Sequence, residues 1–132
     1  MSFDPAGFVA VADRLRKAAA AAECPGDAAL RAAIGRYYYA ALLSARNYLE
    51  ATEPMPVDDS EQTHRWVIRK LRDSADPESQ KLTSELNSMR ITRNRADYGD
   101  DMSDLDGEAG RMAARCGRAL GYVATLVKRY SK

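Results

Sequence analysis

The strongest constraint on this chain is a stripe of hydrophobic residues near its C-terminus that recurs every three or four positions. Its members are Met112, Cys116, Leu120, Val123, Val127 and Tyr130. This spacing is that of one face of an α-helix, which turns once every 3.6 residues. The pattern therefore predicts a long helix from about Asp104, and the hydrophobic face of such a helix needs other helices to cover it.

Four further segments show helical spacing, and signals at their ends indicate where three of them begin. The predicted helices cover about 5–22, 28–51, 58–71 and 76–93. Asp27 is expected to cap the second helix, and Asp58 and Glu61 have capping-box spacing at the start of the third. Asp76, followed by Pro77 at the first helical position, is expected to cap the fourth.

The amino-acid composition agrees with a helical domain. Ala, Leu, Glu, Arg and Lys dominate, while Gly and Pro are sparse. At 132 residues, the chain fits one compact domain with a real hydrophobic core. Because the loops between the predicted helices are short, neighbouring helices should mostly be antiparallel. We therefore predict an all-α fold, an antiparallel up-and-down bundle of four to five helices that forms a single domain over residues 1–132.

Charge and cysteine content restrict the functions that fit. The formal net charge is +1, so phosphate binding requires a local cluster of cations rather than a field over the whole protein. Cys24 and Cys116 match no metal-binding spacing, and no metal or other cofactor is expected. No signal-peptide pattern is present, and no hydrophobic run approaches the ~18 residues of a membrane span. We therefore expect a cytoplasmic protein with reduced thiols and no membrane partner.

The densest polar motif is MRITRNRADYG at residues 89–99. In a helix, Arg90, Arg93, Asn94 and Asp97 fall on one face roughly 100° wide. Guanidinium groups gathered in this way provide planar, bidentate donors for phosphate, or for a carboxylate on a partner protein. The alternative is an exposed basic turn near a helix end.

Three consecutive phenols and a single histidine are the other notable side chains. Consecutive helical residues cannot share a face, so at least one ring of Tyr37, Tyr38 and Tyr39 should point away from the core. Tyr37 and Tyr38 are expected to pack in the core with hydrogen-bonded hydroxyls, and the outward ring would suit a dimer interface. His64 is the only histidine, and it is expected to be packed or solvated rather than to act as a catalytic base.

Three segments together resemble the HEPN domain family, the nucleotide-binding domain of higher eukaryotes and prokaryotes. They are GRYYYAALLSAR at 35–46, HRWVI at 64–68 and RNRADYG at 93–99. The resemblance extends from about residue 30 through the last predicted helix. It implies a four- to five-helix bundle that usually forms a homodimer, with a cleft at the dimer axis lined by the polar motif of both subunits.

Many HEPN proteins are metal-independent endoribonucleases, often toxins of toxin–antitoxin modules or effectors of anti-phage defence. Their active motif is an arginine followed four to six residues later by a histidine, frequently with Asn after the arginine and a Tyr near the histidine. The resemblance places the arginine at Arg93, or at Arg90 with longer spacing, the asparagine at Asn94 and the tyrosine at Tyr98. Asp97 stands where the family has histidine.

This departure bears on catalysis. A neutral imidazole near pH 7 can accept a proton and later return one, whereas a carboxyl with an ordinary pKa near 3.9 is a poor base and no acid there. A carboxylate beside three arginines should stay ionised. Asp97 is therefore expected to pair with Arg90 or Arg93. The resulting candidate site has Arg93, Asn94 and Asp97 as catalytic candidates and Arg90, Arg93, Arg95 and Tyr98 as RNA- or phosphate-binding candidates.

Two functions follow from the resemblance. The first is an RNA- or nucleotide-interacting HEPN protein of a toxin–antitoxin or defence module, cleaving RNA without metal; the retained Arg93–Asn94 pair favours it. The second is a non-catalytic dimeric HEPN adaptor that partners a nucleotidyltransferase antitoxin or another effector, which the missing histidine favours. Tyr98 resembles a residue that such a partner enzyme nucleotidylates; the alternative is that Tyr98 packs at the helix end.

Overall fold

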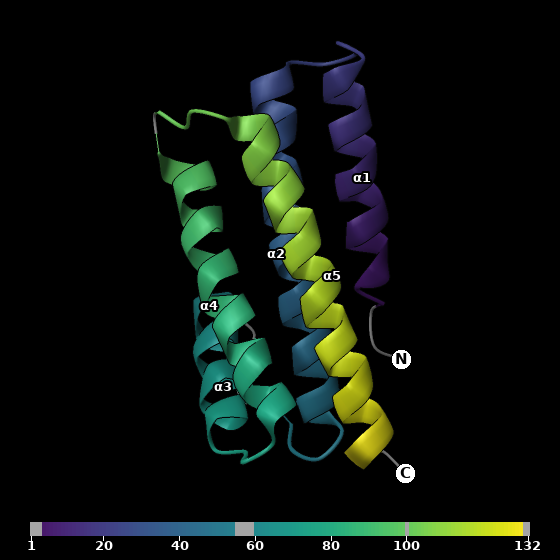
Figure 1. Cartoon of the computed structure of the whole chain (residues 1–132), viewed down its shortest axis with the longest axis vertical. Coiled ribbons are helices and arrows are strands. Elements are labelled where there is room, and N and C mark those ends of the chain that lie inside the picture. The colour runs from purple at the N-terminus through teal and green to yellow at the C-terminus, as the bar shows by residue number, and fades with distance from the viewer. Residues whose placement is uncertain (1–3, 55–59, 100, 131–132) are drawn as a thin grey trace.

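A computed structural model describes residues 4–54, 60–99 and 101–130, and the regular structure in these residues is entirely helical (Figure 1). The five helices are α1 (Ala6–Ala20), α2 (Gly26–Glu50), α3 (Ser60–Arg72), α4 (Pro77–Tyr98) and α5 (Leu105–Tyr130). The predicted all-α bundle is therefore confirmed. The four long helices α1, α2, α4 and α5 alternate in direction along the bundle, as the short loops indicated (Figure 1).

The short helix α3 breaks this alternation, because it runs in the same direction as α2 (Figure 1). Side-chain pairs set the direction: Tyr38 of α2 bonds His64 of α3, and Glu53, just after α2, pairs with Lys70 farther along α3. The helices α3 and α4 then form an antiparallel pair. This arrangement brings the N-terminal half of α3 beside the C-terminal half of α4, which carries the polar motif.

The predicted helix starts have different outcomes. Asp76 caps α4 as expected, since its side chain accepts a hydrogen bond from the backbone N–H of Glu78 at 2.8 Å. The cap predicted for Asp27 is wrong: α2 begins at Gly26, its N-cap is Pro25, and no side chain caps it. Asp27 lies inside the first turn, where a carboxylate favours the helix dipole. Asp58, expected to cap α3, lies outside the described residues.

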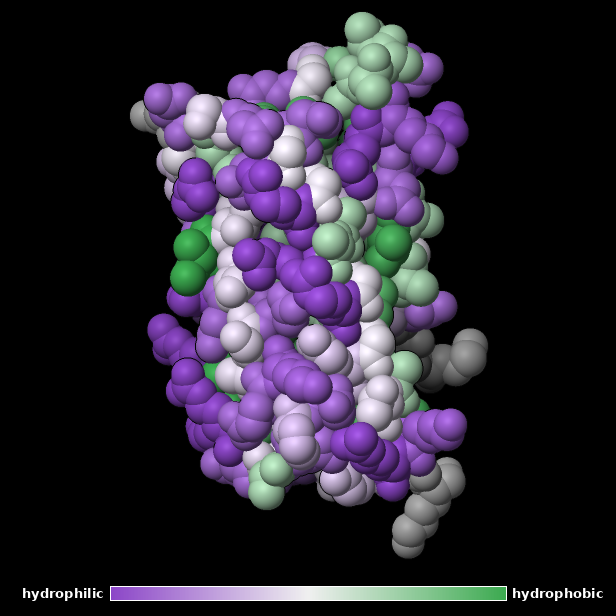
Figure 2. Space-filling model, viewed as in Figure 1, coloured by the Kyte–Doolittle hydropathy of each residue, from purple (hydrophilic) through white to green (hydrophobic). Residues whose placement is uncertain are grey.

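Small side chains allow α2 to sit at the centre of the bundle, in contact with all four other helices. Ala33, Ala40, Ala41 and Ala45 have no exposed surface, so the backbones of neighbouring helices approach closely at these points. One hydrophobic core draws residues from all five helices. The visible face, formed largely by α4 and α5, is mostly polar, with its hydrophobic residues scattered (Figure 2). Among the described residues, no helix combines the length and hydrophobicity needed to cross a membrane.

The hydrophobic stripe of α5 is buried at its start and more exposed in its last turn. Met112 and Cys116 are 1 % exposed, whereas Val127 and Tyr130 are 38 % and 56 % exposed. Leu126 takes the buried position instead. The six positions average 3.6 residues per turn, so the stripe stays on one face of the helix. Val127 and Tyr130 lie in the last turn of α5, at the end of the bundle.

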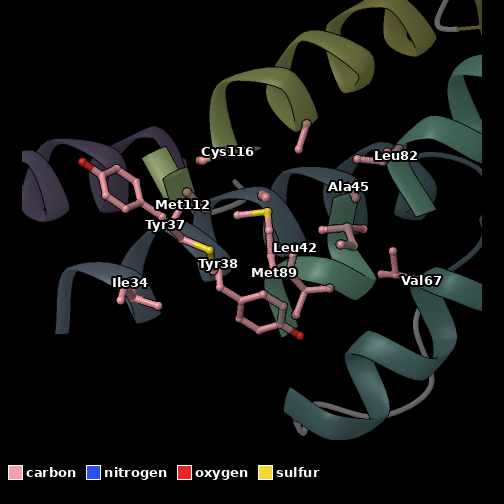
Figure 3. Packing of buried hydrophobic residues seen from close by; sticks show 14 of the residues in the cluster. Ile34, Tyr37, Tyr38, Leu42, Ala45, Val67, Leu82, Met89, Met112 and Cys116 are labelled. Atoms are coloured by element: carbon pink, nitrogen blue, oxygen red, sulfur yellow. The ribbon is translucent and has the colours of Figure 1, made fainter. Parts of the chain in front are cut away.

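The tyrosine run of α2 divides between two sides of the helix. The rings of Tyr37 and Tyr38 are each 1 % exposed and point in opposite directions (Figure 3). The Tyr37 hydroxyl bonds Asp13 of α1, and the Tyr38 hydroxyl bonds His64 of α3. The predicted burial of both rings with satisfied hydroxyls is therefore confirmed. Tyr39 is half-buried and lies beside α4.

Candidate functional site

Arg93 lies in the middle of the α4 motif and is almost fully buried, with 6 % of its surface exposed. Its guanidinium carbon lies 5.4 Å and 5.6 Å from the ring centroids of Tyr38 and Tyr39. Nη1 donates a hydrogen bond to the Tyr39 hydroxyl at 3.1 Å. A guanidinium desolvated against two aromatic rings interacts with their π-faces strongly. This side chain therefore joins α4 to α2.

The ion pair expected for Asp97 forms with Arg93 rather than with Arg90. Arg93 Nε lies 3.1 Å from Asp97 Oδ2, but its hydrogen finds no acceptor among the described residues, so the attraction is Coulombic. Burial lowers the pKa of Arg93, while the phenol of Tyr39 and the carboxylate of Asp97 raise it, and the net shift is upward. Arg90 pairs instead with Glu61 of α3, at 3.2 Å between Nη2 and Oε2.

The end of the motif borders an open hollow at the C-terminus of α4. The hollow, of about 560 Å³, is lined by Glu61, Arg93, Asn94, Arg95, Tyr98 and Gly99. Tyr98 is 78 % exposed, so the packed position considered for it at the helix end is wrong. Amide, guanidinium and phenol groups thus face one space, with positive charge from Arg93 and Arg95 against the single lining carboxylate of Glu61.

Arg31 of α2 fixes the position of this helix end. Its Nη1 donates to the backbone carbonyls of Ala96 at 2.8 Å and Gly99 at 2.7 Å, and its Nε pairs with Asp27 at 2.8 Å. Carbonyl groups in the last turn of a helix lack intrahelical partners, and a cation there also favours the helix dipole. Arg31 therefore holds the Tyr98 end of α4 against α2. Nothing in the spacing of the sequence pointed to this contact.

His64 forms a buried polar network between α2, α3 and α4. It is 5 % exposed, with Nδ1 2.8 Å from the Tyr38 hydroxyl and Nε2 3.2 Å from Asn87 Oδ1. Because an amide oxygen only accepts, Nε2 carries the hydrogen and Nδ1 accepts from Tyr38. His64 was expected to be either packed or solvated, and the structure shows it packed. The role of Asn87 as its partner was not predicted, because 23 residues separate the two in sequence.

The environment of His64 keeps the imidazole neutral. Burial lowers its pKa below the ordinary value of 6.5, and the charge of Arg90 acts in the same direction, while the hydrogen bond to Asn87 opposes both. With both ring nitrogens bonded inside the protein, His64 has no free lone pair directed at the α4 hollow. The lining of the α4 hollow itself includes no histidine.

The structure brings Arg93, Asn94, Arg95 and Tyr98 to one hollow. Arg90 does not line it; it pairs with Glu61 and lines a separate hollow beside α3. Cys116 is buried, which raises the pKa of its thiol to about 11. Over the described ranges, no group of three or more His, Cys, Asp or Glu side chains is arranged to hold a metal ion.

Comparisons with protein-family models, curated proteins and solved structures gave no match.

Proposed function

We propose that this chain is a HEPN-type protein that binds RNA or a nucleotide through the hollow at the end of α4. The observation that supports this most is the convergence of Asn94, Arg95 and Tyr98 on one open space beside the buried charge of Arg93. Guanidinium and amide donors suit phosphate oxygens, and an exposed phenol ring suits stacking with a base. The sequence resemblance supplies the ligand class, and a toxin–antitoxin or defence module is the setting that it implies.

A homodimer is part of this proposal. Ile91 and Tyr98 are 60 % and 78 % exposed, and they lie seven residues apart, on the same face of α4. Exposed large hydrophobic residues that flank a polar motif suit an interface between two copies. A specific interface there should bury about 1,000 Å² or more in total. Light scattering at micromolar concentration should give a dimer, and a monomer would count against it.

The adaptor function is the second candidate, and the surroundings of two residues favour it over cleavage. Asp97 is held by Arg93, and His64 is bonded at both ring nitrogens. Neither is free to take the proton of a 2′-hydroxyl at the α4 hollow. On this proposal the protein binds RNA, or presents Tyr98 to a nucleotidyltransferase, without cutting. If it does cut, the reaction should proceed in EDTA and leave a 2′,3′-cyclic phosphate.

RNA binding by the double variant Asn94→Ala/Arg95→Ala tests the hollow directly. Both side chains line it without contributing to the hydrophobic core, so the variant should fold and bind a labelled RNA about tenfold or more weakly. Arg14→Ala, which removes an exposed charge from α1, is the matched control. Equal binding by the double variant and the control would reject the α4 hollow. Asp97→His, which restores a near-neutral acid–base group, should create cleavage only if the ribonuclease function applies.

A further inference from the structure

A second basic surface lies on α3, and the α4 motif does not include it. Arg65, Arg69 and Arg72 occur at intervals of four and three residues, so they share one face of this helix. All three are exposed. Together with Arg90 they line a hollow of about 390 Å³ between α3 and α4. We refer to Arg65, Arg69 and Arg72 as the α3 row.

Within the part of the chain that the structure describes, the side chains of the α3 row have no partners. No guanidinium of the three forms a hydrogen bond or an ion pair with a described residue, whereas Lys70 on the same helix pairs with Glu53. Four arginines line the hollow against a single carboxylate, Asp73. A net charge of +1 for the whole chain makes this a local excess. Such an excess attracts an anion of several charges.

Helix stability accounts for only part of the row. Cations in the last turn of a helix interact favourably with its dipole, and this explains the placement of Arg69 and Arg72. Arg65 lies before the last turn, and like charges four residues apart, such as Arg65 and Arg69, oppose helix formation. The row therefore gives α3 no clear gain in stability, which points to a ligand outside the chain.

The floor of the hollow is polar and continues toward the α4 site. His64 and Asn87 lie at its base, bonded to each other. Arg90 borders it, and Nε of Arg90 is buried with no hydrogen-bond acceptor within the described residues. The pairing of Arg90 with Glu61 connects the two hollows, because Glu61 lines the α4 hollow. The two hollows therefore adjoin at this ion pair.

We propose that the α3 row binds successive phosphates of a single RNA strand that continues into the α4 hollow. The choice of RNA as the ligand rests on the proposed function, but the residues of the α3 row are separate from those that line the α4 hollow. Seven residues of helix place Arg65 and Arg72 about 10 Å apart along the helix axis. This distance is greater than the size of one phosphate group, so the row suits a chain of phosphates. Ile68, which also lines this hollow, is only 6 % exposed. The lining of the hollow therefore offers no exposed hydrophobic side chain that could insert into a lipid layer.

Binding of a fluorescently labelled single-stranded RNA of twelve nucleotides, followed by anisotropy against salt concentration, tests the proposal. Arg65→Ala/Arg69→Ala should weaken binding about tenfold or more and reduce the slope of log K against log salt by about 1.4, the value for two lost phosphate contacts. Arg14→Ala/Lys17→Ala is the control. It removes two exposed charges from α1, which packs on the opposite side of α2 from α3. Circular dichroism should show all three proteins equally helical.

A second probe, inorganic tripolyphosphate, separates the two proposals. If RNA binds and the Arg65→Ala/Arg69→Ala variant binds it as well as the control variant does, the α3 row is overturned and the α4 hollow is kept. If RNA does not bind but tripolyphosphate binds in a manner that needs Arg65 and Arg69, the row is an anion site and the RNA function fails. Binding of neither probe overturns both. Binding of anionic phosphatidylserine vesicles in place of RNA also overturns the strand proposal.

Discussion

Arg93 of α4 and the arginines of the α3 row lie in opposite surroundings: Arg93 is buried, and the row is exposed. Arg93 is 6 % exposed, stacked on two rings and paired with Asp97. Arg65 and Arg69 are exposed and have no partner among the described residues. A buried guanidinium must be compensated by neighbours, and its removal leaves those neighbours without a partner. An exposed one is compensated by water and stays available to a ligand.

This contrast separates two meanings of an arginine-rich motif. The motif at residues 89–99 is the densest in the sequence, yet its central arginine is committed to holding α4 against α2. The α3 row is sparser in sequence, and its charges are free to act outside the chain. Burial, which spacing alone does not reveal, decides whether an arginine serves the fold or a ligand.

The largest effect is expected for Arg93→Ala. Loss of two cation–π contacts and a charged hydrogen bond to Tyr39 should lower the free energy of unfolding by about 2–3 kcal/mol. Arg95→Ala, two residues farther along and exposed, should change it by less than about 0.5 kcal/mol. Chemical denaturation followed by circular dichroism measures both. Equal effects of the two substitutions would break the contrast between buried and exposed arginines.

A smaller effect concerns His64 and sharpens the same contrast through pH. The folded protein lowers the pKa of His64, so below about pH 6.5 the unfolded chain takes up a proton more readily than the folded one. The free energy of unfolding should therefore fall as pH decreases from 6.5, until the folded protein is protonated as well. His64→Gln, which stays neutral, should flatten this part of the curve. An unchanged curve would mean that His64 does not titrate in this range.

The smallest effect is expected for Asp97→Asn. Arg93 is buried, but the Asp97 side chain is 40 % exposed, and solvent around the carboxylate screens its attraction to Arg93. The loss in unfolding free energy should be about 0.5 kcal/mol or less, with the helical content unchanged. Thermal denaturation in low and high salt checks this prediction, because a Coulombic contribution to stability shrinks with added salt. A loss as large as that of Arg93→Ala would show that Asp97 holds Arg93 in place.

Periodicity was enough to predict the helices, the bundle and much of the core, because each helix shows its buried face in its own spacing. The pairing of Asp97 with a motif arginine also followed from sequence, since both partners lie on one helix. The parallel course of α3 did not, nor did the His64–Asn87 bond or the contact of Arg31 with the end of α4. These depend on how separate helices are placed side by side, which local spacing does not record.

Thermal unfolding with and without tripolyphosphate tests the central claim most directly, because one measurement reports both fold and ligand. A ligand that binds only the folded state raises its melting temperature. Arg93→Ala should melt lower without ligand and keep the part of the rise that the α3 row supplies. Arg65→Ala/Arg69→Ala should melt like the unaltered protein and lose that part of the rise. The reverse result, a stable Arg93→Ala variant without a ligand response and a weakened α3 double variant that keeps one, would contradict the account.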